Sequence, residues 1–115
     1  MNKICTSIEQ SQKLMELGVD VNTADMYWWY YGKNSGKRYY VGTMDDNDFI
    51  KESDIPAWSL SALLKLMPKS IISTPNPFSD NYCCRNVEFD MEFYADNPVD
   101  AAFETLSWLL ENKKL

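Results

Sequence analysis

The stretch Met26–Val41, MYWWYYGKNSGKRYYV, predicts a β-hairpin with aromatic side chains on both strands. Its centre, Asn34-Ser35-Gly36, is typical of a three-residue turn closed by glycine in the left-handed conformation, which would pair Lys33 with Lys37. Side chains of a strand alternate between two faces. The register then predicts an inner face and an outer face, the inner formed by Tyr27, Trp29, Tyr31, Tyr39 and Val41 and the outer by Trp28, Tyr30 and Tyr40. The reverse arrangement is the alternative, but the economy of a small core favours the first.

Two helices have clear start signals. Ser7 and Gln10 form a capping-box pattern for a first helix, and Gly18 stands where that helix should end. Asn97 is the expected cap of the last helix, with Pro98 in its first turn. The apolar residues of the last helix fall on one face and predict a buried stripe of Val99, Ala102, Phe103, Leu106, Leu109 and Leu110.

Two tryptophans differ in what their helical positions predict. Trp58 precedes a helix that Ser59 caps and Pro68 ends, and it stands where a hydrophobic staple with Leu63 forms. We therefore expect Trp58 to have a structural role. Trp108 lies nearly opposite the centre of the buried stripe of the last helix. It should be exposed, or else covered by a partner or by another part of the chain.

Two more strands are predicted, and the remainder of the chain favours loops at 43–54 and over most of 69–84. The first strand is Ser70–Ser73, and the second is Asn86–Tyr94, where apolar and polar residues alternate. Together the elements predict a single α+β domain spanning residues 1–115. Three helices would pack on one face of a mainly antiparallel sheet of three or four strands.

The composition excludes more functions than it indicates. The net charge of −6, from 17 acidic and 11 basic residues, disfavours binding of duplex nucleic acid. The chain has no histidine, which removes Ser-His and Cys-His nucleophile pairs and the commonest zinc ligand. We therefore expect no enzyme activity, no metal and no cofactor. The chain shows no apolar run that would serve as a signal peptide or membrane span, and three cysteines agree with reduced thiols, so a cytoplasmic protein without membrane contact is expected.

Carboxylates gather in two places. The group at 45–54, which includes Asp45, Asp46 and Asp48, does not fit the calcium-loop template and favours a solvated loop. Glu88, Asp90 and Glu92 would share a strand face, with neighbouring carboxylates roughly 7 Å apart. Paired carboxylates at such separations hydrolyse sugars, so this row supports a carbohydrate-binding or hydrolase alternative. A solvated strand face is the favoured interpretation.

Three segments of the sequence carry a resemblance: Thr6–Asp20, Pro56–Leu64, and Tyr94–Glu104 with Trp108-Leu109-Leu110. Together they resemble a family of small uncharacterised proteins coded on prophages and conjugative elements of gut anaerobic bacteria. The resemblance implies an accessory gene on a mobile element. It implies no activity, cofactor or functional residue, because none is established for that family.

The leading functional prediction is a non-enzymatic protein-interaction module accessory to a prophage or mobile element. Its partner would be another protein or a second copy of the chain. The expected binding residues are four aromatic side chains: Trp28, Tyr30, Tyr40 and Trp108. Two alternatives remain beside it. One is the small-ligand or carbohydrate binder or hydrolase that uses strand carboxylates, and the other is an acidic inhibitor that mimics nucleic acid.

Overall fold

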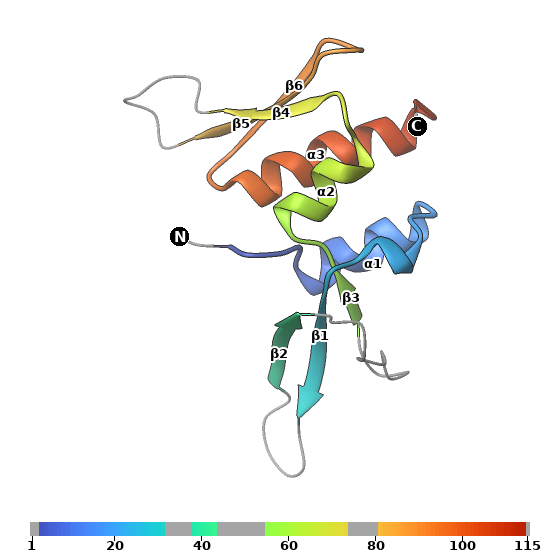
Figure 1. Ribbon diagram of the computed structural model, residues 1–115, viewed down its shortest axis with the longest axis vertical. Coiled ribbons are helices and arrows are strands. Elements are labelled where there is room, and N and C mark those ends of the chain that lie inside the picture. The colour runs from blue at the N-terminus through green and yellow to red at the C-terminus, as the bar shows by residue number, and fades with distance from the viewer. Residues whose placement is uncertain (1–2, 32–37, 44–54, 74–80, 115) are drawn as a thin grey trace.

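The computed structural model describes residues 3–31, 38–43, 55–73 and 81–114. The elements are, in order, α1 (Ile8–Glu16), the 3-10 helix η1 (Val21–Thr23), β1 (Met26–Tyr31), β2 (Arg38–Thr43), β3 (Ile55–Ala57), α2 (Leu60–Leu66), β4 (Ser70–Ser73), β5 (Tyr82–Asn86), β6 (Met91–Ala95) and α3 (Pro98–Glu111). The strands form two antiparallel sheets: an N-terminal sheet in the order β2-β1-β3 and a C-terminal sheet in the order β4-β5-β6. In Figure 1 the helices lie between the two sheets.

The predicted α+β class is confirmed, but the expectation of one sheet covered by all three helices is wrong. The six described strands divide into two sheets of three. The reason is a long-range pairing: β3 joins β1, so the middle of the chain completes the N-terminal sheet before α2 begins. Of the three helices, α3 packs along the C-terminal sheet, while α1 lies beside β3 (Figure 1).

Local capping signals place the ends of α1 as predicted. The Ser7 hydroxyl accepts from the Gln10 N–H at 3.1 Å, and the Gln10 side chain accepts from the Ser7 N–H at 2.9 Å. Gly18 takes φ +94° after the last turn, a conformation that favours glycine. The Val19 N–H then donates to the Leu14 carbonyl at 3.0 Å, so the chain folds back over the helix end.

The caps of α2 and α3 are confirmed as well. The Ser59 hydroxyl accepts from the Ala62 N–H at 3.2 Å, and Asp25 adds support by accepting from both the Ser59 N–H and its hydroxyl. The Asn97 side chain accepts from the Asp100 N–H at 2.8 Å. The bonds that Ser59 and Asn97 accept each satisfy a backbone donor that the first helical turn leaves without an internal partner.

The predicted hairpin is present, but its predicted register is wrong by one residue. Trp28 pairs with Val41 and Trp29 pairs with Tyr40, whereas the turn prediction paired Trp29 with Val41. The predicted turn itself lies outside the described residues. A one-residue shift moves every position of one strand to the other face. Position 40 is therefore on the same face of the hairpin as position 29 and on the opposite face from positions 28 and 30.

The predicted strand at 86–94 is confirmed only from Met91 onward, where it coincides with β6. Asn86 ends β5, and residues 87–90 form the turn of the β5–β6 hairpin. The Asn86 side chain accepts from the Phe89 N–H at 3.0 Å, and Asp90 takes φ +54°, a conformation that aspartate tolerates. The alternation of polar and apolar residues concealed these two turn residues. Strands β3 and β5 were also missed.

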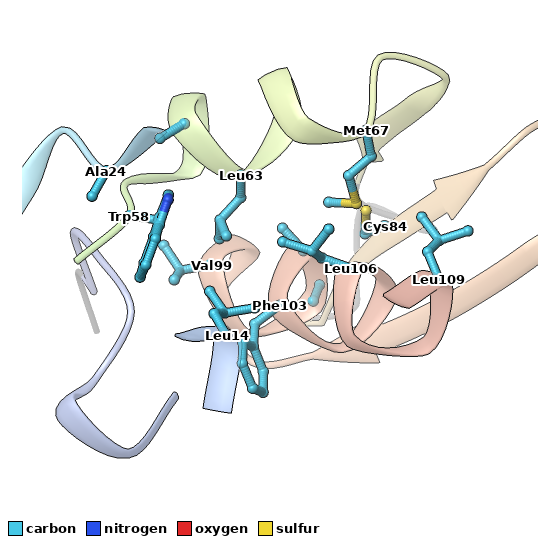
Figure 2. Packing of buried hydrophobic residues seen from close by; sticks show 13 residues of the cluster. Leu14, Ala24, Trp58, Leu63, Met67, Cys84, Val99, Phe103, Leu106 and Leu109 are labelled. Carbon is cyan, nitrogen blue, oxygen red and sulfur yellow. The ribbon is translucent and has the colours of Figure 1, made fainter. Parts of the chain in front are cut away.

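The main core lies where α1, α2, α3 and the C-terminal sheet meet. Trp58 and Leu63 are fully buried there, and Figure 2 shows both among side chains of α1 and α3. The structural role of Trp58 is therefore confirmed. The predicted stripe of α3 is buried, except that Leu110 is only partly so. Trp108 is partly buried against Phe89, with ring centroids 6.4 Å apart, so another part of the chain covers it.

Candidate functional site

The candidate site is a cleft between the N-terminal segment and β1, with a volume of about 290 Å³. We call it the N-terminal cleft, and five residues line it: Lys3, Ile4, Cys5, Ser7 and Trp28. Ile4 is 54% exposed, so its side chain is accessible from solvent. Cys5 pairs with Ser59 in an isolated antiparallel bridge, which holds this segment against the end of β3. The cleft is mostly apolar, with an indole as one wall.

Trp28 is fixed in this wall rather than placed on a free outer face. Its indole N–H donates to the Thr6 carbonyl at 2.9 Å. The side chain is partly buried and packs against a small core cluster of Cys5, Met26 and Ala57. The expectation of an outer face shared by Trp28, Tyr30 and Tyr40 is thus wrong at Trp28, because the N-terminal segment covers part of the indole.

Lys3 anchors the other side of the cleft through a polar network. Its ammonium group donates to the Gln10 side chain at 2.7 Å and forms an ion pair with Asp100 at 2.6 Å. Gln10 also donates to Asp100 at 2.8 Å, as does Asn97. Burial raises the pKa of Asp100, but the hydrogen bonds from Lys3, Gln10 and Asn97 outweigh it and lower the pKa below its ordinary value. The network ties the N-terminal segment to the starts of α1 and α3.

Acid should destabilise the protein through Asp100. Because its pKa is lower in the folded state, the carboxylate contributes stability above its ordinary pKa of about 3.9, and this contribution is lost as the pH falls through the lowered value. Chemical denaturation at a series of pH values should show the free energy of unfolding of Asp100→Asn to be lower near neutral pH and to decline less below about pH 4. The exposed Glu104→Gln variant is the control and should decline like the parent. An unchanged decline in Asp100→Asn would contradict the assignment.

The thiol in the cleft forms an apolar wall. Burial raises the pKa of Cys5 to about 11, with smaller effects from Lys3 and Asp25, so the thiol is protonated at neutral pH. Burial likewise raises the pKa of Cys84. All three cysteines are buried free thiols. A protonated Cys5 has little nucleophilic character, which leaves the cleft suited to binding by contact.

The structure does not bring all four predicted aromatic site residues together, although positions 28 and 30 share a face of β1. Tyr30 lies on β1 and Tyr40 on β2, at register positions that belong to opposite faces, and their side chains lie outside what the structure describes. Trp108 lies on α3 and packs against Phe89 in the β5–β6 turn. Of the four predicted residues, only Trp28 lines the N-terminal cleft.

The predicted row of carboxylates does not form. Glu88 and Asp90 belong to the β5–β6 turn, while Glu92 lies on β6. Asp90 pairs with Arg85 at 2.7 Å, and Glu92 lies 3.9 Å from the same guanidinium group. The acidic group at 45–54 lies outside the described residues. Among residues that the structure describes, no group of three or more potential metal ligands occurs.

One face of the C-terminal sheet is turned away from the helices (Figure 1). It carries Ile71 of β4 and Tyr94 of β6, exposed by 55% and 53%. The Tyr94 hydroxyl donates to the Glu92 carboxylate at 2.7 Å, and this hydrogen bond raises the pKa of Tyr94 to about 12. Tyr94 is therefore neutral at physiological pH. We call this surface, formed by Ile71, Arg85, Glu92 and Tyr94, the outer sheet face.

The sequence did not single out the remaining residues of the cleft. Lys3, Ile4 and Cys5 precede the first helix in a segment without apolar periodicity. The pairing of Cys5 with Ser59, which positions them, leaves no local pattern. The outer sheet face had one signal in the sequence. The predicted strand Ser70–Ser73 has two adjacent isoleucines, and because neighbouring side chains of a strand point to opposite faces, one of them had to lie on the outer face.

None of the helices in the described parts of the chain has the length and apolar character needed to cross a membrane. Comparison with protein-family models, curated proteins and solved structures finds no match to this chain. The origin on a mobile element therefore stays a prediction from the resemblance of three segments.

Proposed function

We propose that the protein is a non-enzymatic protein-interaction module, accessory to a mobile element, that receives an apolar side chain of a partner protein in the N-terminal cleft. The observation that supports it is an open cleft with Ile4 and Trp28 in its walls. Tryptophan is enriched at the energetic centres of interfaces because it combines a large apolar surface with a fixed shape. Here the hydrogen bond to Thr6 fixes the indole before any partner arrives.

The size and chemistry of the cleft favour a side chain over a metabolite. Its volume of about 290 Å³ lies at the lower limit of small-molecule sites, which are typically about 300–1,000 Å³. Its polar groups are already engaged inside the protein. Lys3 bonds to Gln10 and Asp100, and the Ser7 hydroxyl caps α1. Recognition in this cleft would therefore depend on apolar contact.

The carbohydrate-binding or hydrolase alternative loses its geometric basis, because Glu88 and Asp90 lie in a turn and pair with Lys69 and Arg85. The acidic mimic of nucleic acid stays a prediction from the net charge of −6. No arrangement of described residues supports either alternative.

Titration with N-acetyl-leucine amide, followed by the amide and indole resonances in NMR spectra, tests the proposal. We expect saturable shifts at residues 3–7 and at the Trp28 indole N–H, with a dissociation constant on the order of 1 mM because the probe is small. Ile4→Glu should weaken binding about tenfold or more, because it places a charge in an apolar wall.

The matched control is Val21→Glu, since Val21 is also an exposed apolar residue, 41% accessible, but lies in η1 outside the cleft. It should bind the probe like the parent protein. N-acetyl-glycine amide, which lacks the apolar side chain, should cause no saturable shifts. Shifts spread over the whole molecule, or equal losses in Ile4→Glu and Val21→Glu, would refute the cleft as the binding site.

A further inference from the structure

Strand β4 differs from every other edge strand that the structure describes. The two sheets have four such edges, β2, β3, β4 and β6. Natural proteins commonly protect sheet edges with charged residues or proline. Accordingly, β2 contains Arg38, β3 contains Pro56 and β6 contains Glu92. The sequence of β4, Ser-Ile-Ile-Ser, has neither protection.

The backbone of β4 presents hydrogen-bonding groups at this open edge. The Val87 N–H donates to the Lys69 carbonyl at 3.0 Å, so Lys69 and Val87 form a bonded pair of the β4–β5 ladder. Bonded and non-bonded pairs alternate in antiparallel sheets. The pair of Ile72 and Cys84 is then non-bonded, and the N–H and C=O of Ile72 point away from β5. The Ser70 N–H, which points the same way, already donates to Met67 at 2.9 Å.

The side chains of β4 also suit a second β-strand. Ile71 lies on the outer sheet face and is 55% exposed, while Ile72 lies on the inner face and packs against the main core. No residue of β4 is charged, and Lys69, just before it, lies 3.9 Å from Glu88. Pairing of β4 with a copy of itself therefore places no charged residue of the strand beside a like charge.

We propose that β4 pairs antiparallel with β4 of a second copy, which joins two C-terminal sheets into one continuous sheet of six strands. The proposal goes beyond the N-terminal cleft and does not depend on it. A two-fold axis perpendicular to the sheet keeps each face on the same side, so the two Ile71 side chains meet on the outer sheet face. Each Ile72 N–H gains a carbonyl of the other copy. The edge is thus complementary to itself.

The dimer should be weak, because the paired strand has four residues and interfaces of this extent lie at the small end of specific ones. Analytical ultracentrifugation over a series of concentrations should show a monomer–dimer equilibrium with a dissociation constant on the order of 10–100 μM. Ile71→Lys should raise this constant about tenfold or more, because it places two like charges beside the two-fold axis.

The chain offers a closely matched control. Val21→Lys makes the same kind of change at another exposed apolar residue, 41% accessible, which lies in η1 and not in the C-terminal sheet. It should dimerise like the parent. Circular dichroism should show both variants to be folded, since both substituted side chains are exposed.

Hydrogen exchange of the parent protein gives a second test that needs no variant. The Ile72 amide should exchange more slowly as the protein concentration rises, whereas the Ile71 amide, bonded to β5, should be protected at every concentration. A protein that stays monomeric at about 1 mM would overturn the proposal. So would a dimer in which the Ile72 amide is not protected or in which Ile71→Lys and Val21→Lys behave alike.

Discussion

Trp58→Ala should lower the free energy of unfolding by about 3–5 kcal/mol, the usual cost of truncating a fully buried large aromatic side chain. Trp58 is 0% exposed and lies in the main core with residues of α1, α2 and α3, so its removal leaves a cavity between three helices. At about 5 °C per kcal/mol for a domain of this size, the melting temperature should fall by roughly 15–25 °C. Chemical and thermal denaturation followed by circular dichroism measure both quantities.

A second variant separates volume from hydrogen bonding. The Trp58 indole N–H donates to the Thr23 hydroxyl at 2.9 Å. Trp58→Phe keeps most of the apolar volume and loses this bond, so it should cost only about 1–2 kcal/mol. Trp108→Ala is the surface comparison, because Trp108 is partly exposed. If Trp58→Ala costs no more than Trp108→Ala, Trp58 is not the centre of the core.

The sequence was most informative where the deciding contacts are local. The caps of all three helices were predicted, and in the structure each cap accepts a hydrogen bond from the residue three positions on: Ser7 from Gln10, Ser59 from Ala62, and Asn97 from Asp100. Such bonds depend on the conformation of one helical turn. The same locality explains why Gly18 marked the end of α1.

Strand pairing was predicted less well, because it joins residues that are distant in the chain. The pairing of β3 with β1 divides the strands into two sheets, and nothing in the sequence of either strand encodes that choice. Alternation at 86–94 predicted a strand, yet Asn86 and Asp90 stabilise a turn in its middle. Periodicity describes a face, and it does not reveal where the chain reverses.

The candidate site illustrates the same limit. Trp28 was identified because aromatic residues are conspicuous, but its surroundings were not. Its indole bonds to the Thr6 carbonyl, 22 residues away in the sequence, and this contact changes an expected exposed side chain into the wall of a cleft. The shift of the hairpin register by one residue also separated Tyr40 from Trp28. Both facts arise from tertiary contacts.

Thr6 connects the N-terminal segment to the core, which makes Thr6→Val the second large effect expected. Its N–H donates to the Trp58 carbonyl at 2.9 Å, and its hydroxyl accepts from the Trp58 N–H at 3.1 Å and bonds to the Ser11 hydroxyl at 2.8 Å. Thr6, Ser11 and Trp58 are all 0% exposed. Valine has nearly the same shape, so the variant leaves two buried polar groups without their partner and should cost about 2–5 kcal/mol.

Two further variants show whether the hydroxyl is responsible. Thr6→Ser keeps it and loses one methyl group, so it should cost only about 1 kcal/mol. In the double variant Thr6→Val with Ser11→Ala, neither hydroxyl of the pair remains, and its total cost should be less than the sum of the two single costs. Denaturation of the parent protein, Thr6→Val, Ser11→Ala and the double variant completes a double-mutant cycle. Additive costs would contradict a direct bond between Thr6 and Ser11, whereas a positive coupling would assign the stability of this junction to the buried pair.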